Sequence, residues 1–352
     1  MKNLLVLILS LVIFFNPLQQ IFAEENSNQI ISDDSSSVNI KDTATNEISF
    51  NNIWKEYKYM IIGGAVFIGV CVKILYDKKN NDKEQIISGK SSDNFENNDA
   101  YFYFKQGNER FDKKEYDKAI DDFTKAIELN PNDADYYFCR GLAWQYKKEY
   151  DKAIADYSKV IEFKPNMNDI YHFRGYVWQA KADYLSMKNS HKIPLYEYDK
   201  ALADYTKAIE FNPDDFDNYD GRGLIWLNKK EFDKAIADYN KAIELNPNET
   251  SGYWGLANLY ATSSNENYRN GKMAIEYALK ACSISQSSDN LDALAAAYAT
   301  SGLFEKAIET QTKAIKIRTK DINISNEMDE FIKAESLKRL ELYKQKKIYI
   351  DY

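Results

Sequence analysis

The stretch that decides the fold is KEYDKAIDDFTKAIELNP at residues 114–131, because it recurs three more times along the chain. The other copies are KEYDKAIADYSKVIEFKP at 148–165, EYDKALADYTKAIEFNP at 197–213 and KEFDKAIADYNKAIELNP at 230–247. Their final prolines are spaced by 34, 48 and 34 residues, so one period is kept and the third unit carries a 14-residue insertion. Such self-similarity indicates a stack of small supersecondary units.

Each copy has the apolar spacing of an amphipathic helix. In the second copy, Ala153, Ile154, Tyr157 and Val160 recur at steps of three and four, which gives one apolar face, and Pro165 ends the helix. The first half of every unit carries a tyrosine and, four residues later, a glycine. This pattern predicts a first helix that packs closely on the second. These pairs are Tyr103 and Gly107, Tyr137 and Gly141, Tyr171 and Gly175, and Tyr219 and Gly223.

The units resemble tetratricopeptide repeats, whose pattern has small, aromatic and proline positions at a period of 34 residues. Gly141, Ala153, Tyr157 and Pro165 match that pattern in the second unit. The resemblance implies an all-α superhelical solenoid of about six helix-turn-helix repeats, whose first helices line a concave groove that binds peptides or partner helices. The expected repeats are 100–133, 134–167, 168–215 with the insertion, 216–249, 250–287 and 288–321, followed by a capping helix at 322–352.

The N-terminal part of the chain has the features of a membrane anchor. Residues 1–23 are typical of a signal peptide, either cleaved or kept as an anchor, and residues 24–58 have the composition of a disordered polar tether. Residues 59–76 read YMIIGGAVFIGVCVKILY and predict a single transmembrane helix, with a buried soluble helix as the alternative. Residues 77–98 are expected to form a linker to the repeats.

The lysines around this span predict its orientation. Lys73, Lys78, Lys79 and Lys83 lie at or after its C-terminal end, and fewer lysines precede it. The positive-inside bias therefore places the repeat array in the cytoplasm, at the inner (cytoplasmic) membrane. The difference in positive charge between the two sides is small, because Lys55 and Lys58 lie close to the N-terminal end of the span. An extracytoplasmic array therefore stays the alternative.

Composition argues against several classes of function. The formal net charge is −8, with lysines and arginines intermixed with carboxylates, so we expect no nucleic-acid partner. None of the three cysteines belongs to a CxxC pair, His172 and His191 are the only histidines, and no HExxH, GxxxxGK[ST] or GxSxG motif is present. We therefore expect no catalytic residues, no metal site, no cofactor and no small-molecule substrate.

The best-known variant of the repeat clamps the C-terminal carboxylate of chaperones with lysine, asparagine and arginine side chains. Transferred residue by residue, the resemblance places Phe104, Asn108, Cys139, Asp169 and Phe173 at the clamp positions. Only Asn108 agrees with the clamp, and all three expected cations are missing. An anionic tail would lack its charge partner, so the sequence argues against this role.

The predicted groove is instead aromatic with acidic edges. Such a surface suits a protein or peptide segment that carries apolar and basic residues. The alternative is that several of the aromatic rings pack between helices and that the acids are solvated residues at helix starts. The candidate groove residues are Tyr101, Phe104, Asn108, Phe138, Tyr146, Asp169, His172, Phe173, Tyr176 and Asp220.

Together these features predict a non-catalytic scaffold for protein-protein interactions, tethered to the membrane through 59–76. An extracytoplasmic repeat protein that assists envelope protein assembly is the second interpretation. An accessory subunit or cryptic enzyme that uses the insertion as a loop at 183–198 is the third, and only the length of that segment supports it.

Overall fold

The computed structural model of the chain describes residues 94–188, 194–321 and 327–350, all within one compact unit. The predicted signal peptide, tether and transmembrane helix lie outside these residues. Residues 77–93 of the predicted linker also lie outside them. The last five residues of that linker, 94–98, are helical, because α4 begins at Asn94. Within the described ranges, no helix combines the length and the apolar character needed to cross a bilayer.

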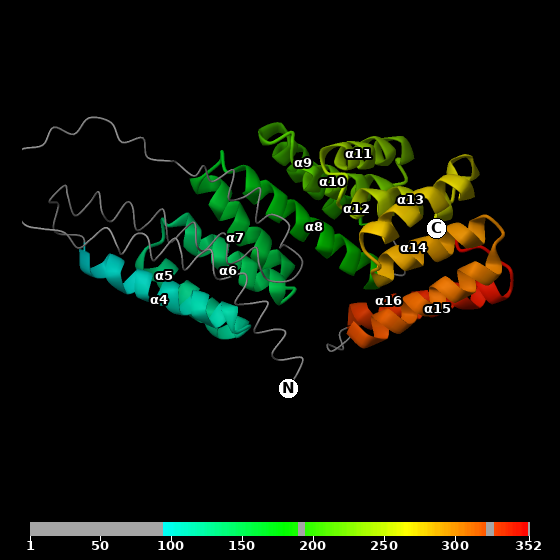
Figure 1. The fold of residues 1–352 in the computed structure, drawn as a ribbon. Coiled ribbons are helices and arrows are strands. Elements are labelled where there is room, and N and C mark those ends of the chain that lie inside the picture. The colour runs from blue at the N-terminus through cyan, green and yellow to red at the C-terminus, as the bar shows by residue number, and fades with distance from the viewer. Residues whose placement is uncertain (1–93, 189–193, 322–326, 351–352) are drawn as a thin grey trace, which may run out of the picture. The chain divides into compact units, whose positions relative to one another are not determined.

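The described residues form an all-α solenoid of helical hairpins, as the repeat pattern predicts (Figure 1). The pairs are α4 (Asn94–Asp112) with α5 (Tyr116–Leu129), α6 (Ala134–Tyr146) with α7 (Tyr150–Phe163), α8 (Asn168–Lys188) with α9 (Leu195–Phe211), α10 (Phe216–Asn228) with α11 (Phe232–Leu245), α12 (Ser251–Thr262) with α13 (Gly271–Ile284), and α14 (Ser288–Thr300) with α15 (Phe304–Asp321). A short 3₁₀ helix, η2 (Glu266–Tyr268), precedes α13, and α16 (Glu327–Lys344) follows the last pair.

Local sequence explains where these helices begin and end. The second helices of the first four repeats each end two residues before the repeat's proline, because the residue that precedes a proline disfavours the helical conformation. The next first helix begins after an aspartate in two of the repeats. Asp133 accepts a hydrogen bond from the backbone N–H of Asp135 at 3.1 Å, and Asp215 caps α10 in the same way.

The insertion in the third repeat lengthens the hairpin, and this corrects the prediction of a loop at 183–198. Helix α8 continues to Lys188, and α9 begins at Leu195, so only the short segment between them connects the two helices. No glycine or proline interrupts residues 182–188, and the helix therefore continues beyond the point where the other repeats turn. Pro194 precedes the first residue of α9, and the connection ends there.

Within a repeat, a small residue on the first helix receives an aromatic ring from the second. A Cβ atom added to Gly141 would lie 2.7 Å from the ring of Tyr157, and one added to Gly107 would lie 2.5 Å from Phe123. Ala153, next to these contacts on the second helix, is fully buried. The small and aromatic positions of the repeat pattern therefore set the close approach of the two helices.

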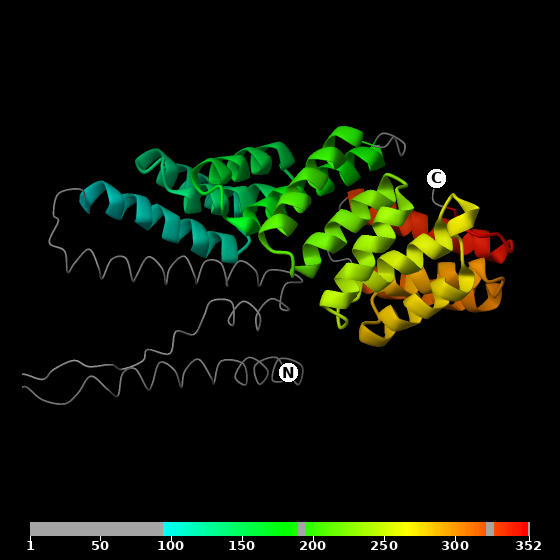
Figure 2. The same cartoon turned by 90° about the horizontal axis from the view of Figure 1, so that it is seen from above.

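Each second helix packs against the first helix of its own repeat and the first helix of the next repeat, as Figure 2 shows from above. Helix α5 lies between α4 and α6, and α7 lies between α6 and α8 in the same way. Every hairpin thus buries its second face against the following hairpin. A stack of neighbours supplies the core that no single hairpin can form.

A repeated ion pair links three helices at each of three junctions. Arg174 on α8 donates two parallel hydrogen bonds to the buried carboxylate of Asp204 on α9, at 2.8 and 2.7 Å, and a third to Ser158 on α7 at 3.0 Å. The same arrangement joins Arg140 to Asp156 and Thr124, and Arg222 to Asp238 and Thr206. Each arginine therefore bridges one repeat to the preceding one.

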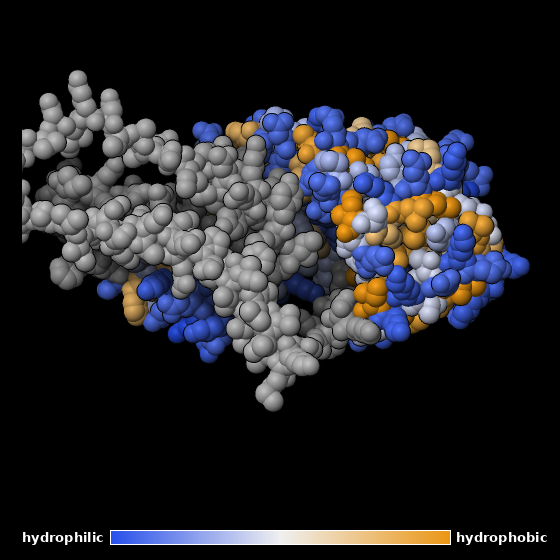
Figure 3. Space-filling view, in the orientation of Figure 1, coloured by the Kyte–Doolittle hydropathy of each residue, from blue (hydrophilic) through white to orange (hydrophobic). Residues whose placement is uncertain are grey.

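Helix α16 packs mainly on α15, with smaller contacts to α14 and α8. Tyr343 is fully buried there, whereas Leu337 is exposed. The predicted capping helix therefore exists over Glu327–Lys344 and covers part of the last repeat. In the space-filling view of Figure 3, apolar residues show among hydrophilic ones over the C-terminal repeats, and Leu279 and Leu303 are among the exposed apolar side chains.

Candidate peptide-binding groove

The ten predicted groove residues all lie on first helices. Helix α4 contacts α6, and α8, α10, α12 and α14 contact one another in turn, so the first helices form neighbouring rows along the array. The second helices cover one side of these rows. A partner segment would therefore lie on the other side, where side chains of several first helices are available together.

Two of the predicted aromatic groove residues are buried. Phe104 and Phe138 are 0% and 2% exposed. The ring of Phe104 lies 4.9 Å from Tyr136 on the next first helix, and that of Phe138 lies 5.1 Å from Phe173. Their position falls where successive first helices approach each other, so the rings fill the space between the helices. Neither side chain is accessible to a partner, and this corrects the expectation for these two residues.

Phe173 and His172 link neighbouring helices and stay partly exposed. Phe173 contacts Phe138 on α6, and its ring lies 5.9 Å from that of His172. Nδ1 of His172 lies 2.8 Å from Oδ1 of Asn218 on α10, a hydrogen bond in which Nδ1 carries the proton. Both side chains thus have structural partners and are partly exposed.

Tyr146 and Tyr176 are the exposed aromatic residues among those predicted. Tyr146 on α6 is 44% exposed, and Tyr176 on α8 is 46% exposed. The ring of Tyr146 stacks on Tyr116 with centroids 5.2 Å apart, and its edge meets Phe111 at 5.3 Å. These contacts fix the position of the Tyr146 ring while part of its apolar surface stays exposed to solvent.

Three further tyrosines extend this surface. Tyr150 lies 6.1 Å from Tyr184, and burial together with the nearby Tyr176, Asp183 and Tyr184 raises the pKa of Tyr150. We define the tyrosine patch as the set Tyr116, Tyr146, Tyr150, Tyr176 and Tyr184. Sequence reasoning missed three of its members because two begin second helices, which the resemblance places away from the groove, and the third lies in the insertion.

The remaining polar and N-terminal candidates are largely engaged in packing. Asn108 is buried, Asp169 lies partly buried in the first turn of α8, and Tyr101 lies 6.4 Å from Phe104. A carboxylate in a first helical turn stabilises the helix dipole. For Asp169, the alternative interpretation of a helix-start acid therefore fits its position.

Asp220 is the carboxylate whose environment is most unusual. Burial, with additional repulsion from Asp217 and Glu249, raises its pKa to about 7, although a hydrogen bond with Ser251 acts in the opposite direction. Its Oδ1 atom is buried and has no hydrogen-bond partner among the described residues. Asp220 occupies the same repeat position as Phe104, so a carboxylate here stands in a row of aromatic side chains.

The described residues bring together no group of three histidine, cysteine or acidic side chains that would hold a metal ion. Cys139 is buried and Cys282 is partly buried. His191, one of the two histidines of the chain, lies outside the described residues.

Family models for the repeat match the chain at the places where the structure shows helix pairs. A model described as "Tetratricopeptide repeat" matches residues 134–167 and 221–249, and another with the same description matches 289–321. A model described as "TPR repeat" matches residues 107–145. The chain is a tetratricopeptide-repeat (TPR) protein.

Solved structures with a similar arrangement of helices include other TPR proteins. MamA 41-end from Desulfovibrio magneticus RS-1 is 19% identical, with a TM-score of 0.45 over 53% of this chain and 96% of that chain. PilF of Pseudomonas aeruginosa is 16% identical, with a TM-score of 0.49 over 68% and 99%. YrrB, titled a TPR protein with an unusual peptide-binding site, is 22% identical, with a TM-score of 0.40 over 61% and 97%. No curated protein sequence matches the chain.

Proposed function

We propose that this TPR protein is a non-catalytic scaffold that binds a protein or peptide segment carrying apolar and basic residues. The observation that carries the proposal is the exposure of Tyr146 and Tyr176, which lie on the first helices of successive repeats and belong to the tyrosine patch. Exposed aromatic clusters on a rigid surface are typical of interaction sites, because they offer large contact areas at low entropic cost.

The chemistry of the tyrosine patch defines the second half of the proposed partner. Tyrosine rings accept lysine and arginine side chains on their faces, so a segment that carries basic as well as apolar residues fits the patch.

Affinity capture with mass spectrometry tests this site on the full-length protein extracted from membranes. We compare the wild type with the Tyr146→Ala/Tyr176→Ala variant and with Tyr196→Ala as a control, since Tyr196 is 61% exposed on α9 and lies outside the patch. A partner lost only from the double variant supports the proposal. Equal recovery from the double variant and the wild type rules out the tyrosine patch as the site.

We propose further that the array is attached to the cytoplasmic membrane through residues 59–76 and lies in the cytoplasm. This part of the proposal rests on the eighteen-residue apolar stretch and on the lysines that follow it. Alkaline extraction of membranes, combined with protease protection of the array in right-side-out and inverted vesicles, tests both statements. Release of the chain by alkali contradicts the anchor, and cleavage only from the outer side favours the extracytoplasmic alternative.

A further inference from the structure

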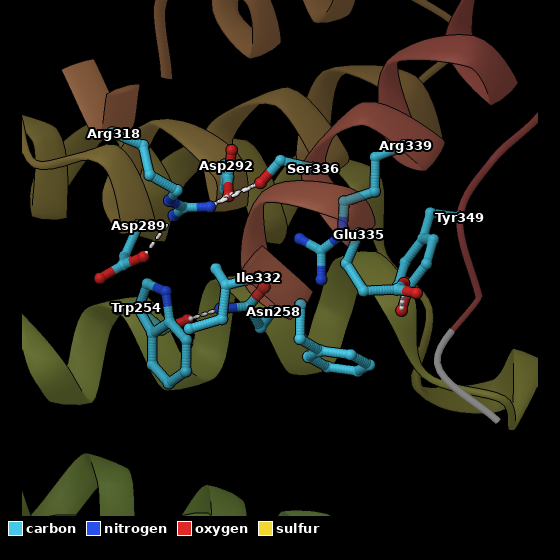
Figure 4. Close-up of a pocket in the computed structure, with 11 residues that line it drawn as sticks. Trp254, Asn258, Asp289, Asp292, Arg318, Ile332, Glu335, Ser336, Arg339 and Tyr349 are labelled. Atoms are coloured by element: carbon cyan, nitrogen blue, oxygen red, sulfur yellow. Dashed lines mark hydrogen bonds and ion pairs between the residues drawn. The ribbon is translucent and has the colours of Figure 1, made fainter. Parts of the chain in front are cut away.

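A cavity of about 400 Å³ lies between the last two repeats and α16, away from the tyrosine patch (Figure 4). Its walls come from α12, α14, α15 and α16, and from Tyr349 in the segment that follows α16. The volume is within the range of small-ligand sites in proteins. Because α16 lies outside the repeats, this cavity is a feature of this chain and does not follow from the repeat pattern.

One wall of the cavity is a closed ion-pair network. Arg318 donates hydrogen bonds to Asp292 at 2.9 Å and to Asp289 at 2.6 Å. Asp292 also accepts from Ser336 at 3.0 Å and from Gln311 at 2.7 Å. Arg318 and Asp292 are both buried. Each charged side chain of this wall therefore has a partner within the wall, although its two carboxylates outnumber the single guanidinium.

The opposite wall contains Arg339, whose guanidinium group is only partly satisfied. Its central carbon lies 4.3 Å from the centre of the Tyr349 ring, and its Nε is buried with no hydrogen-bond acceptor among the described residues. The nearby Glu335 accepts from the hydroxyl of Tyr349 and from Lys338, each at 3.3 Å. Figure 4 shows the guanidinium of Arg339 projecting into the space between these residues and the network of Arg318.

Apolar side chains complete the lining. The indole of Trp254 and the side chain of Ile332, which is partly exposed, face the same space as Arg339 in Figure 4. The guanidinium of Arg339 lies over the face of the Tyr349 ring, which is a cation–π contact. A ligand in this cavity would therefore meet one planar cation and a largely apolar wall.

We propose that this cavity binds a carboxylate attached to an apolar group, with Arg339 as the carboxylate-binding residue and Trp254 and Ile332 as the apolar wall. A guanidinium group matches a planar carboxylate with two parallel hydrogen bonds. Phosphate fits less well, because a dianion would meet a single available cation beside the acidic side chains of Asp289 and Glu335.

A carboxylate attached to an apolar group can come from two sources. One source is the C-terminal residue of a peptide or protein, and the other is a free organic acid. The site is independent of the proposed groove, since it uses the fifth and sixth repeats and α16. The tyrosine patch uses residues of the first three repeats.

Calorimetric titration of the full chain tests the proposal with four probes. These are N-acetyl-phenylalanine, its amide, an eight-residue peptide that ends in phenylalanine, and the same peptide with an amidated C-terminus. We expect at least one free acid to bind ten-fold or more tightly than its own amide, because only the acid pairs with the guanidinium. Arg339→Gln should remove this difference, and Lys338→Gln, which removes a charge from the exposed side of the same helix, should keep it.

The outcomes separate the two sources and can overturn the proposal. Preferential binding of both free acids supports a site for small carboxylic acids, and preferential binding of the peptide acid alone supports recognition of a C-terminus. Equal affinity for acids and amides, or no binding of any probe, overturns the proposal on wild-type protein alone. If Arg339→Gln folds, as its melting curve will show, and still binds the free acid as tightly as the wild type, the proposed role of Arg339 is wrong.

Discussion

The hydroxyl group of Tyr157 donates a hydrogen bond of 2.8 Å to Oε1 of Gln145, which connects the second helix of the second repeat to its first helix. Tyr205 and Gln179 make the same contact in the third repeat at 2.9 Å. In the fourth repeat, Tyr239 is equally buried, but Leu227 stands where the glutamine would be, and the hydroxyl has no partner among the described residues. The fourth repeat thus buries a tyrosine hydroxyl without a partner among the described residues, whereas the second and third repeats hydrogen-bond the equivalent hydroxyl.

This difference predicts opposite effects for the same substitution. Tyr157→Phe should destabilise its repeat by about 1 kcal/mol, because Gln145 loses its donor, whereas Tyr239→Phe should be neutral or slightly stabilising. Hydrogen-deuterium exchange resolved by peptide measures this, since repeats open locally. Equal loss of protection in the two variants would contradict the assignment of the unpaired hydroxyl.

The three-helix ion pairs predict a large cost for removing one partner. Arg174→Met should lower the free energy of unfolding by about 3–5 kcal/mol, because the buried carboxylate of Asp204 is left without its cation. Adding Asp204→Asn should restore part of the loss, since no unpaired charge stays buried. The exposed pair of Lys207 and Glu210 is the control, and Lys207→Ala should cost less than about 0.5 kcal/mol. Thermal unfolding of the solubilised chain gives the comparison.

The turns between the helices of a repeat place a lysine in a left-handed conformation. Lys114, Lys148 and Lys230 have φ values of 61°, 60° and 61°, and Gly302 occupies the corresponding turn of the sixth repeat with φ 77°. Lys148→Gly should therefore stabilise the chain by roughly 0.5–1 kcal/mol, and Gly302→Ala should destabilise it by about 1 kcal/mol. Melting temperatures that move in the same direction for both variants would be inconsistent with this explanation.

The period of the sequence was sufficient to predict the helix pairs, because the positions that define them act within one hairpin. Gly141 and Tyr157 meet across a single turn, and their spacing is visible in the sequence. The burial of Phe104 and Phe138 could not be predicted in the same way, since it depends on how closely successive first helices approach. The predicted groove residues therefore all lie on first helices, and the packing between repeats buries two of their aromatic rings.

Two other features had sequence signals that went unused. An arginine directly precedes the glycine in the second, third and fourth repeats, as at Arg140 and Gly141, and it marks the three-helix ion pairs. The residues from Ala182 to Lys188 contain no helix breaker, which favours the extension of α8 over a loop. The cavity beside α16 had no such signal, because Arg339 and Trp254 are far apart in the sequence and meet only through tertiary packing.

The raised pKa of Asp220 predicts how stability changes with pH. In the folded chain this carboxyl keeps its proton up to about pH 7, whereas its ordinary value of 3.8 applies when the chain unfolds. Between these values the folded state binds more protons, so its stability falls as the pH rises. Asp220→Asn should be as stable as the wild type near pH 4 and more stable at pH 8, by roughly 1–3 kcal/mol.

Asp183 provides the matched comparison. Burial raises the pKa of Asp183 to about 6, although Tyr198 donates a hydrogen bond of 2.9 Å to this carboxyl. The loss of stability that its ionisation causes should therefore level off about one pH unit below that of Asp220. Thermal unfolding of the wild type, Asp183→Asn and Asp220→Asn across pH 4 to 8 separates the two groups. Between about pH 6 and 7 Asp220→Asn should flatten the decline in stability more than Asp183→Asn does, because Asp183 is more than half ionised over this range and Asp220 is not. A decline that persists unchanged in Asp220→Asn would show that this carboxyl is ionised at lower pH and is paired in a way that the structure does not contain.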